Sequence, residues 1–421
     1  MSILVHIFVK KTNNIIMYRF IKKLNEFRIN YKLAFLYSSI LCVVASIVAG
    51  FVNNTNTISI IKNVLNFLVN LVFIYVIVNY NIKNKFYNLY LLLLFIMSTV
   101  VTYFYNVDNY SIVATMLLAL LLVYIYNKFK YKYAFIISFT LFLAFAIATI
   151  YLSPVCLYYL KQFAEFIKTK PSLFVVINNI YKLFVSNNLE NLIYYSGIGL
   201  TKIIDNRIIT GVMECFSNYD NNDLSVANFL SSHYVVNIFV VLGLLLNIYN
   251  KIDNKTKLTF LIVCFSTIIS GNNLIISLFL LLLNPLSYFS YLFLYFLANI
   301  IISSVEIKIG FLGYPSIIEL LKYIEKPIYF MVIGIVFIFL SYYLFELVFE
   351  KFNAQNDFYI DKNAKRIITS LGGLKNIQRI EDDIIIVKNP NLINILKLDC
   401  EIYNNNVILL QNDLIVLKDY F

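Results

Sequence analysis

The sequence predicts a polytopic α-helical membrane protein with about ten membrane segments, some of them broken or re-entrant, and a small C-terminal α/β domain. Of its 421 residues, 60% are hydrophobic and 14% are charged. Several apolar runs approach or exceed the roughly 20 residues that cross a bilayer core. After Phe352 the pattern changes to short β-rich runs separated by turn-forming residues. These observations predict a membrane domain followed by a second, smaller domain.

Residues 1–32 form a basic segment before the first apolar run. The positive-inside rule places such a segment in the cytoplasm. Because much of the net charge of +11 lies at this membrane flank, it indicates the lipid bilayer as partner and predicts no nucleic-acid binding. Met1 and Met17 both remain possible start positions. The basic residues are Lys10, Lys11, Arg19, Lys22, Lys23, Arg28 and Lys32.

The membrane domain is expected over residues 33–350. Basic loops follow the second and fourth spans, where the chain should return to the cytoplasm. With an even number of spans, the C-terminal domain is also cytoplasmic in a multi-pass protein of the cell membrane. The expected spans are Leu33 to Val52, Val64 to Val78, Leu89 to Tyr105, Ser111 to Tyr126, Ala134 to Leu157, Val235 to Ile248, Leu258 to Ile269, Leu274 to Ile302 with an interruption at Pro285, and Pro327 to Val348.

Residues 171–326 contain several segments too short to cross a bilayer alone. Within them, GNNLIISLFLLLLNPLSY at 271–288 places Gly-Asn-Asn and Asn-Pro in apolar surroundings. Such helix-breaking residues predict broken or re-entrant helices. These persist at membrane depth only where protein or a water-filled cavity forms hydrogen bonds with the unpaired backbone groups. That organisation is typical of transporters.

Two sets of polar residues recur at helical spacing. They either line a cavity that hydrogen-bonds a sugar or hold neighbouring helices together, and the second interpretation is favoured. The sets are Asn284, Tyr288, Tyr291, Tyr295 and Asn299 in one segment, and Asn63, Asn66 and Asn70 in the other.

Metal and cofactor chemistry has little support in the sequence. The five cysteines lie far apart with no paired spacing, which argues against a metal site or a disulfide framework. Only two histidines are present. His233 is expected to be a polar residue at the membrane interface. We therefore expect neither a metal nor a cofactor.

The C-terminal domain is expected over residues 361–421, after a linker at 351–360. The stretch AKRIITSL reads as a helix that begins near Asp361 and ends at Gly372-Gly373. Two later runs, DDIIIVK and NNNVILLQ, read as strands separated by turn residues.

This order resembles the enzyme IIB domain of the glucose-type bacterial sugar phosphotransferase system. The family pattern is a helix, then GG-x-x-NI, then a loop that bears a phosphocysteine. Gly372, Gly373, Asn376 and Ile377 match it within AKRIITSLGGLKNIQRIEDDIIIVK, and NILKLDCEIYNNNVILL resembles the domain's last helix and hairpin.

The preceding region resembles the partner enzyme IIC domain. There a GITEPIEF loop is followed by a segment ending A-P-L-L-Y, and Gly271, Pro285 and Tyr288 fall at similar spacings. FVVLGLLLNIY resembles that family's FGLPAAALAIY, and YYSGIGLTK resembles the segment that ends FGLHH. Together the similarities cover roughly residues 190–420, in the family's order.

The resemblance implies a sugar permease that takes a hexose or amino-hexose, forms a homodimer and works with other proteins of the phosphotransferase system. It implies no cofactor. The substrate-binding positions that it implies are Gly271, Asn272, Asn273, Ser277, Thr201 and Lys202.

Several residues that bind the sugar or carry the phosphoryl group in that family are absent from this sequence. Leu274 and Ser277 stand where the family has its sugar-loop glutamates, and Thr201-Lys202 stands for its His-His pair. Asp383, or Asp382 if the loop shifts by one, stands at the phosphocysteine position. We therefore assign no catalytic residue and expect sugar translocation without phosphoryl transfer by this chain. The alternatives are a non-catalytic scaffold or regulatory relative, and an unrelated polytopic exporter.

Overall fold

The computed structural model divides the chain into two compact units, Met1–Glu346 and Leu347–Phe421, each described here by itself. The residues that it describes are 23–24, 26–52, 54–104, 111–129, 131–185, 188–196, 198, 200–204, 207–218, 224–249, 251–252, 254–324, 326–373, 376–380, 384–394, 398, 400–403 and 406–409.

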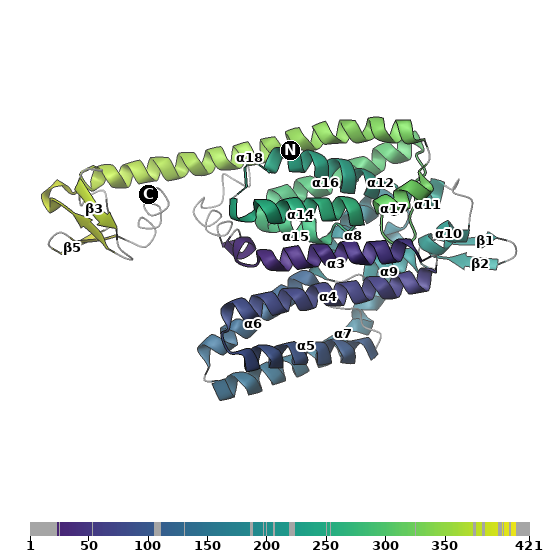
Figure 1. Ribbon diagram of the computed structural model, residues 1–421, viewed down its shortest axis with the longest axis horizontal. Helices are drawn as coiled ribbons and strands as arrows, with labels where there is room; N and C mark the ends of the chain where they lie inside the picture. Colours follow the sequence, from purple (N-terminus) through teal and green to yellow (C-terminus); the bar gives the residue numbers. More distant parts are fainter. Residues whose placement is uncertain are drawn as a thin grey trace. The chain divides into compact units, whose positions relative to one another are not determined.

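The first unit begins with long apolar helices. Helix α3 packs against both α4 and α14, and α4 in turn packs against α5 and α6 (Figure 1). Helix α7 contacts α5 and α6. Each of the first five expected spans is helical over most or all of its length. The bounds are α3 Lys32–Gly50, α4 Thr55–Asn81, α5 Lys85–Phe104, α6 Ile112–Lys128 and α7 Tyr131–Ile167.

The middle of the first unit consists of shorter pieces. A two-stranded hairpin, β1 with β2, separates the short helices α9 and α10. Residues 224–249 form an almost continuous helical stretch that includes the π-helix η1 Val235–Val240. The bounds are α8 Pro171–Phe184, α9 Asn188–Tyr194, β1 Thr201–Ile204, β2 Arg207–Thr210, α10 Val212–Asn218, α11 Leu224–Leu230, α12 Ser232–Tyr234, α13 Val241–Ile248, α14 Asn254–Ser270, α15 Leu274–Leu283, α16 Pro285–Val305 and α17 Ile317–Tyr323.

The two sequence breaks occur where the motifs predict them. Helix α14 ends at Ser270, and Gly271 has a φ of +70°, a conformation that glycine adopts without a side-chain penalty. A β-carbon there would collide with the backbone of Pro315. Asn284 is extended, and its side-chain oxygen accepts from the N–H of Leu286 at 3.0 Å to cap α16.

Helices α15 and α16 pack against each other as a hairpin around Asn284. The amide of Asn273, just before α15, donates to the hydroxyl of Tyr295 on α16 at 3.0 Å, which joins the two arms far from their connection. Helix α15 has only 10 residues. At about 1.5 Å per residue it spans roughly half of a bilayer core.

A buried, largely non-helical segment at 307–316 covers this break. Its backbone is satisfied by side chains, as irregular backbone at depth requires. The hydroxyl of Ser231 donates to the carbonyl of Ile309 at 2.8 Å and accepts its N–H at 3.0 Å. The hydroxyl of Tyr234 donates to the carbonyl of Gly310 at 2.9 Å.

Five helices in the described part of the chain are long and apolar enough to cross a membrane. Shorter apolar helices of 10–17 residues accompany them, including α6, α14 and α15. The chain is thus a helical protein with the composition of a membrane protein. The five long candidates are Lys32–Gly50, Thr57–Asn81, Ser225–Ile248, Pro285–Val305 and Pro327–Val348.

Helix α18, Pro327–Ser370, runs from the first unit into the second without interruption. A helix beginning at Asp361 was expected, and that start is wrong because Asp361 lies inside α18. The predicted end is confirmed: Gly372 and Gly373 have φ values of +87° and +89°, and the N–H of Gly373 donates to the carbonyl of Ile368 at 2.8 Å.

The second unit continues as a four-stranded antiparallel sheet with the order β3-β4-β6-β5. The two runs expected to be strands contain β4 and β6. The bounds are β3 Ile377–Ile380, β4 Ile385–Val387, β5 Cys400–Tyr403 and β6 Asn406–Leu409. The core where the last turns of α18 meet the sheet consists of Ile367, Ile368, Leu371, Ile385, Val387, Ile393, Leu398 and Val407.

Candidate functional site

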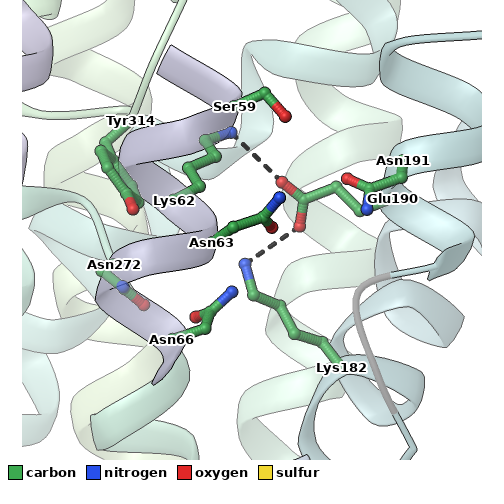
Figure 2. A pocket seen from close by; sticks show the side chains of 9 residues that line it. All are labelled: Ser59, Lys62, Asn63, Asn66, Lys182, Glu190, Asn191, Asn272 and Tyr314. Carbon is green, nitrogen blue, oxygen red and sulfur yellow. Dashed lines mark hydrogen bonds and ion pairs between the residues drawn. The ribbon is translucent and has the colours of Figure 1, made fainter. Parts of the chain in front are cut away.

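Three charged residues from three helices, Glu190 buried and both lysines partly buried, meet in the first unit (Figure 2). Lys62 lies on α4, Lys182 on α8 and Glu190 on α9. The Nζ atom of Lys62 is 3.3 Å from Oε1 of Glu190, and the Nζ atom of Lys182 is 3.0 Å from Oε2. Each lysine therefore engages a different oxygen of one carboxylate.

These residues line two adjoining pockets, which we call together the Lys62 cavity. Both pockets are lined by Lys62, Lys182, Glu190, Asn272 and Tyr314. Other amides complete the walls, Asn63 and Asn66 in one pocket and Asn178, Asn179 and Asn273 in the other. The larger pocket has a volume of about 30 Å³, room for one or two water molecules. A larger solute requires lining side chains to move.

The ion pairs keep Glu190 charged. Burial alone raises the pKa of this carboxyl, but the ammonium groups of Lys182 and Lys62 outweigh burial and hold the pKa below its ordinary value. The hydroxyl of Tyr195 is 2.9 Å from the Nζ of Lys62, and the rings of Tyr195 and Tyr314 lie 5.4 and 5.3 Å from it. Cation–π contacts of this kind favour a charged lysine.

A network of buried hydrogen bonds extends from the cavity floor into the helices behind it. The amide nitrogen of Asn273 donates to Oδ1 of Asn179 at 2.6 Å and to the hydroxyl of Tyr295 at 3.0 Å. That hydroxyl is 2.9 Å from Nδ1 of His233, whose Nε2 is 3.2 Å from the hydroxyl of Tyr194. Such a network fixes the position of the loop that carries Asn273.

The π-helix η1 supplies a further anchor for that loop. The amide of Asn237, in η1, donates to the carbonyl of Gly271 at 2.8 Å, and its oxygen accepts from Tyr295 at 3.3 Å. π-Helical turns within α-helices often occur at functional sites. The side chain of Asn237 is completely buried, so this bond is shielded from competing water.

The expected substrate-binding residues separate into two groups. Gly271, Asn272 and Asn273 line the Lys62 cavity. Ser277 is buried one helical turn beyond Asn273 on α15, away from the lining. Thr201 and Lys202 lie on strand β1 and do not line the cavity.

The polar set on α16 does not line the Lys62 cavity, and part of it joins helices. The hydroxyl of Tyr295 and the amide of Asn299 are bonded to neighbouring helices, as helix-joining groups would be. The hydroxyls of Tyr288 and Tyr291 and the Nδ2 atom of Asn284 are buried without a hydrogen-bond partner among the described residues. On α4, Asn63 and Asn66 line the cavity, and Asn70 is buried.

His233 was expected at the membrane interface, and the structure buries it instead. It lies between Tyr194 and Tyr295 and also lines the Lys62 cavity. Its position near the start of an apolar run suggested a boundary residue. The run in fact begins about two turns earlier, within the candidate span Ser225–Ile248.

The charged trio was missed by sequence reasoning. Lys62, Lys182 and Glu190 are far apart in the chain, and no motif connects them. One signal was available: Lys62 lies inside the apolar helix Thr57–Asn81, and an ionisable residue in a membrane span marks a candidate functional site. Its partners could not be identified without the fold.

Asp382 and Asp383 lie outside the described residues, between strands β3 and β4. Ile386, which the resemblance aligns with an arginine that follows the phosphocysteine in the enzyme IIB domain, lies in β4 and pairs with Arg379 of β3. No group of three or more His, Cys, Asp or Glu suited to a metal ion occurs in the described part of the chain. The sequence matches no protein-family model and no curated protein.

Proposed function

We propose that this chain is a permease-like membrane protein of the phosphotransferase-system type, which binds a small, multiply hydroxylated solute of the sugar class in the Lys62 cavity. The cavity itself carries the proposal. Amide, hydroxyl and charged groups gather there among apolar helices, beside a helix break at Gly271. Convergent polar groups in an otherwise apolar protein are typical of small-molecule sites.

The topology proposed from the sequence places the Lys62 cavity near the outer face of the membrane. With the N-terminus in the cytoplasm of a cell-membrane protein, the second candidate span, Thr57–Asn81, starts at the outer face, and Lys62 lies five residues inside it. The cavity then faces solute arriving from outside. The C-terminal unit lies in the cytoplasm, and the resemblance favours a homodimer.

The small volume of the cavity indicates that transport includes a conformational change. A sugar needs more room than one or two water molecules, so lining side chains or the α15–α16 hairpin move during uptake. Movement of the hairpin requires the connection at 271–273 to be released from the hydrogen bonds of Asn237 and Asn273 that hold it in this structure.

We further propose that this chain does not phosphorylate its solute. The resemblance places Leu274 and Ser277, which cannot act as bases, at the sugar-loop glutamates. A non-catalytic scaffold is the alternative. It predicts no solute binding by the cavity.

The test uses the purified full chain in detergent and in liposomes. Binding and uptake are measured with labelled neutral, amino and acidic hexoses. We expect at least one class to bind and to enter, and Asn66→Leu to weaken binding by about tenfold or more because it removes a polar lining group. Thr140→Leu, on an exposed face of α7, is the matched control and should leave binding unchanged.

Absence of binding and uptake for every class would contradict the permease and favour the scaffold. Equal losses in the Asn66 and Thr140 variants would instead show that the cavity is not the binding site.

A further inference from the structure

The charges of the Lys62 cavity do not cancel. Among the described residues that line it, two carry ammonium groups and one carries a carboxylate. The remaining polar lining residues are amides, hydroxyls and His233, which is counted as neutral. The cavity therefore has a net charge of about +1 at neutral pH.

This charge is shielded from water. The side chains of Lys62, Lys182 and Glu190 are only 11%, 16% and 9% exposed. Burying a net charge is costly unless an opposite charge compensates it. The tyrosine rings beside Lys62 reduce this cost but carry no negative charge.

The other buried carboxylate of this region, Glu319, interacts electrostatically with Lys62 and with Lys322, and Lys322 on its own helix offsets its charge. Glu319 lies on α17 and does not line the cavity. Its carboxylate accepts the N–H of Leu312 at 3.3 Å. Lys322 follows one turn later on the same helix, so the charges of Glu319 and Lys322 on α17 sum to zero.

The geometry also leaves donors for a ligand. An ammonium group has three N–H donors. Glu190 accepts one from each lysine, and Tyr195 engages a second on Lys62. Lys182 therefore retains donor capacity beside the uncharged amides of Asn66 and Asn272, which suit hydroxyl groups.

We infer that the solute of the Lys62 cavity is a sugar acid, whose carboxylate lies against Lys182 and Lys62 while its hydroxyls meet the amides. This inference rests on the proposed function and specifies its substrate class. Glu190 holds the two lysines together and limits the net charge to +1. That balance favours a carboxylate over a phosphate monoester, which carries −1.5 to −2 at neutral pH.

The test compares acids with their neutral counterparts. Binding to the purified full chain in detergent is measured by calorimetry for D-glucuronate, D-galacturonate and D-gluconate against D-glucose, D-galactose and sorbitol, with glucose 6-phosphate and inorganic phosphate as further probes. Ionic strength is held constant. We expect at least one acid to bind at least about tenfold more tightly than its neutral counterpart and than either phosphate compound.

Lys182→Met is the decisive variant because it removes the ammonium group and keeps an unbranched side chain of similar length. It makes the cavity neutral while the ion pair between Lys62 and Glu190 remains. The acid should then bind at least about 30-fold more weakly, as expected when one partner of a buried charge pair is truncated, while the neutral sugar is little affected. Lys182→Arg should restore most of the preference. Lys168→Met, which removes a partly exposed ion pair with Glu165 just after the end of α7, is the control and should change nothing.

Equal binding of an acid and its neutral counterpart, in the native chain, would overturn the sugar-acid inference and leave the permease standing. Tighter binding of glucose 6-phosphate or of inorganic phosphate alone would also overturn it. Binding of none of the probes would contradict both the inference and the proposed function.

Discussion

Glu190 connects the charge of the cavity to the stability of the first unit. Its pKa is raised by burial but is held below its ordinary value of 4.5 by the ammonium groups of Lys182 and Lys62. The unfolded chain therefore binds this proton more readily than the folded chain. The stabilisation from Glu190 is fully present above about pH 4.5 and is lost as the pH falls toward the lowered pKa.

We predict that Glu190→Gln flattens the acid side of the stability profile. The melting temperature of the detergent-solubilised chain is measured from pH 7 to pH 3. The native chain should lose stability as the pH falls below about 4.5, and the variant should lose less over the same range because its amide does not titrate. It should also be less stable at neutral pH, since two buried lysines lose their carboxylate.

Glu165→Gln provides the comparison for this effect. Glu165 lies on α7, is 60% exposed and pairs with Lys168 at 3.6 Å, so water already screens its charge. Its removal should leave the acid profile nearly as in the native chain. If both variants shift the profile equally, the buried ion pairs do not govern acid stability.

Single residues also show where sequence reasoning reached its limit. Asn272 and Asn273 were predictable site residues because polar side chains beside a helix-breaking glycine are unusual in an apolar chain. Lys182 and Glu190 were not, since they follow the fifth span in a stretch where charged residues are ordinary. Only the fold, which brings side chains of α4, α8 and α9 to one cavity, gives them a shared role.

At the scale of elements, two of the buried tyrosines on the α15–α16 hairpin differ in their hydrogen-bond partners. Tyr295 is bonded through its hydroxyl to His233 and Asn273. Tyr291, one turn earlier on the same helix, has no hydrogen-bond partner for its hydroxyl among the described residues. The rings of both are fully buried and contact each other at a centroid distance of 5.5 Å.

We predict opposite responses when each hydroxyl is removed. Tyr295→Phe should lower the free energy of unfolding by about 1–3 kcal/mol, because buried partners lose a hydrogen bond. Tyr291→Phe should leave stability unchanged or slightly raised, because it removes a polar atom that is costly to bury. The free energy of unfolding of both variants and of the native chain is measured by denaturation in the same detergent. A large loss for Tyr291→Phe alone would show that its hydroxyl has a structural partner in solution.

The breaks that create this hairpin were predictable from local chemistry, whereas the length of α18 was not. A glycine with positive φ ends a helix, and a proline in the first turn starts one, so both are strong local signals. The residues between the expected membrane span and Asp361 contain neither glycine nor proline, so nothing local ends the helix there. A change in hydrophobic pattern was mistaken for a change in secondary structure.

For the whole molecule, hydropathy predicted where helices lie but not which of them meet. The expected spans coincide with helices because an apolar run must satisfy its own backbone hydrogen bonds. The contact between α3 and α14, which are far apart in sequence, has no local signal. The Lys62 cavity depends on such distant contacts, which explains why its charged residues were missed.

The C-terminal unit shows which parts of the family-like motif have a structural role. The amide of Asn376 donates to the carbonyls of Leu371 and Asn389 at 2.7 and 2.9 Å, and its oxygen accepts the N–H of Asn389 at 2.8 Å. Gly372 has positive φ and packs against Leu392. These residues close the helix onto the sheet, so they serve the fold regardless of any phosphoryl chemistry.

The resemblance proposed from the sequence fails at the positions that phosphoryl transfer needs. The resemblance places Asp383 or Asp382 at the phosphocysteine and Ile386 at the following arginine. Ile386 lies in strand β4, where its backbone pairs with β3 and β6 and its apolar side chain cannot hold a phosphate. A labile phosphocysteine needs a thiolate with cations or backbone amides nearby. On the proposed resemblance, the residues that match the motif serve the fold, and the positions of its reactive residues carry other side chains.

We therefore predict that the full chain accepts no phosphoryl group at this loop. The purified protein is incubated with a labelled phosphoryl donor and the soluble carrier proteins of a phosphotransferase system, with and without hexoses, and a functional IIB domain serves as the positive control. Label should appear on the control and not on this chain. Aspartate forms acyl phosphates in other enzymes, so label on Asp383 or Asp382, removed by the Asp→Asn variant, is the result that would overturn the prediction. It would make this chain an active phosphotransferase in its own right.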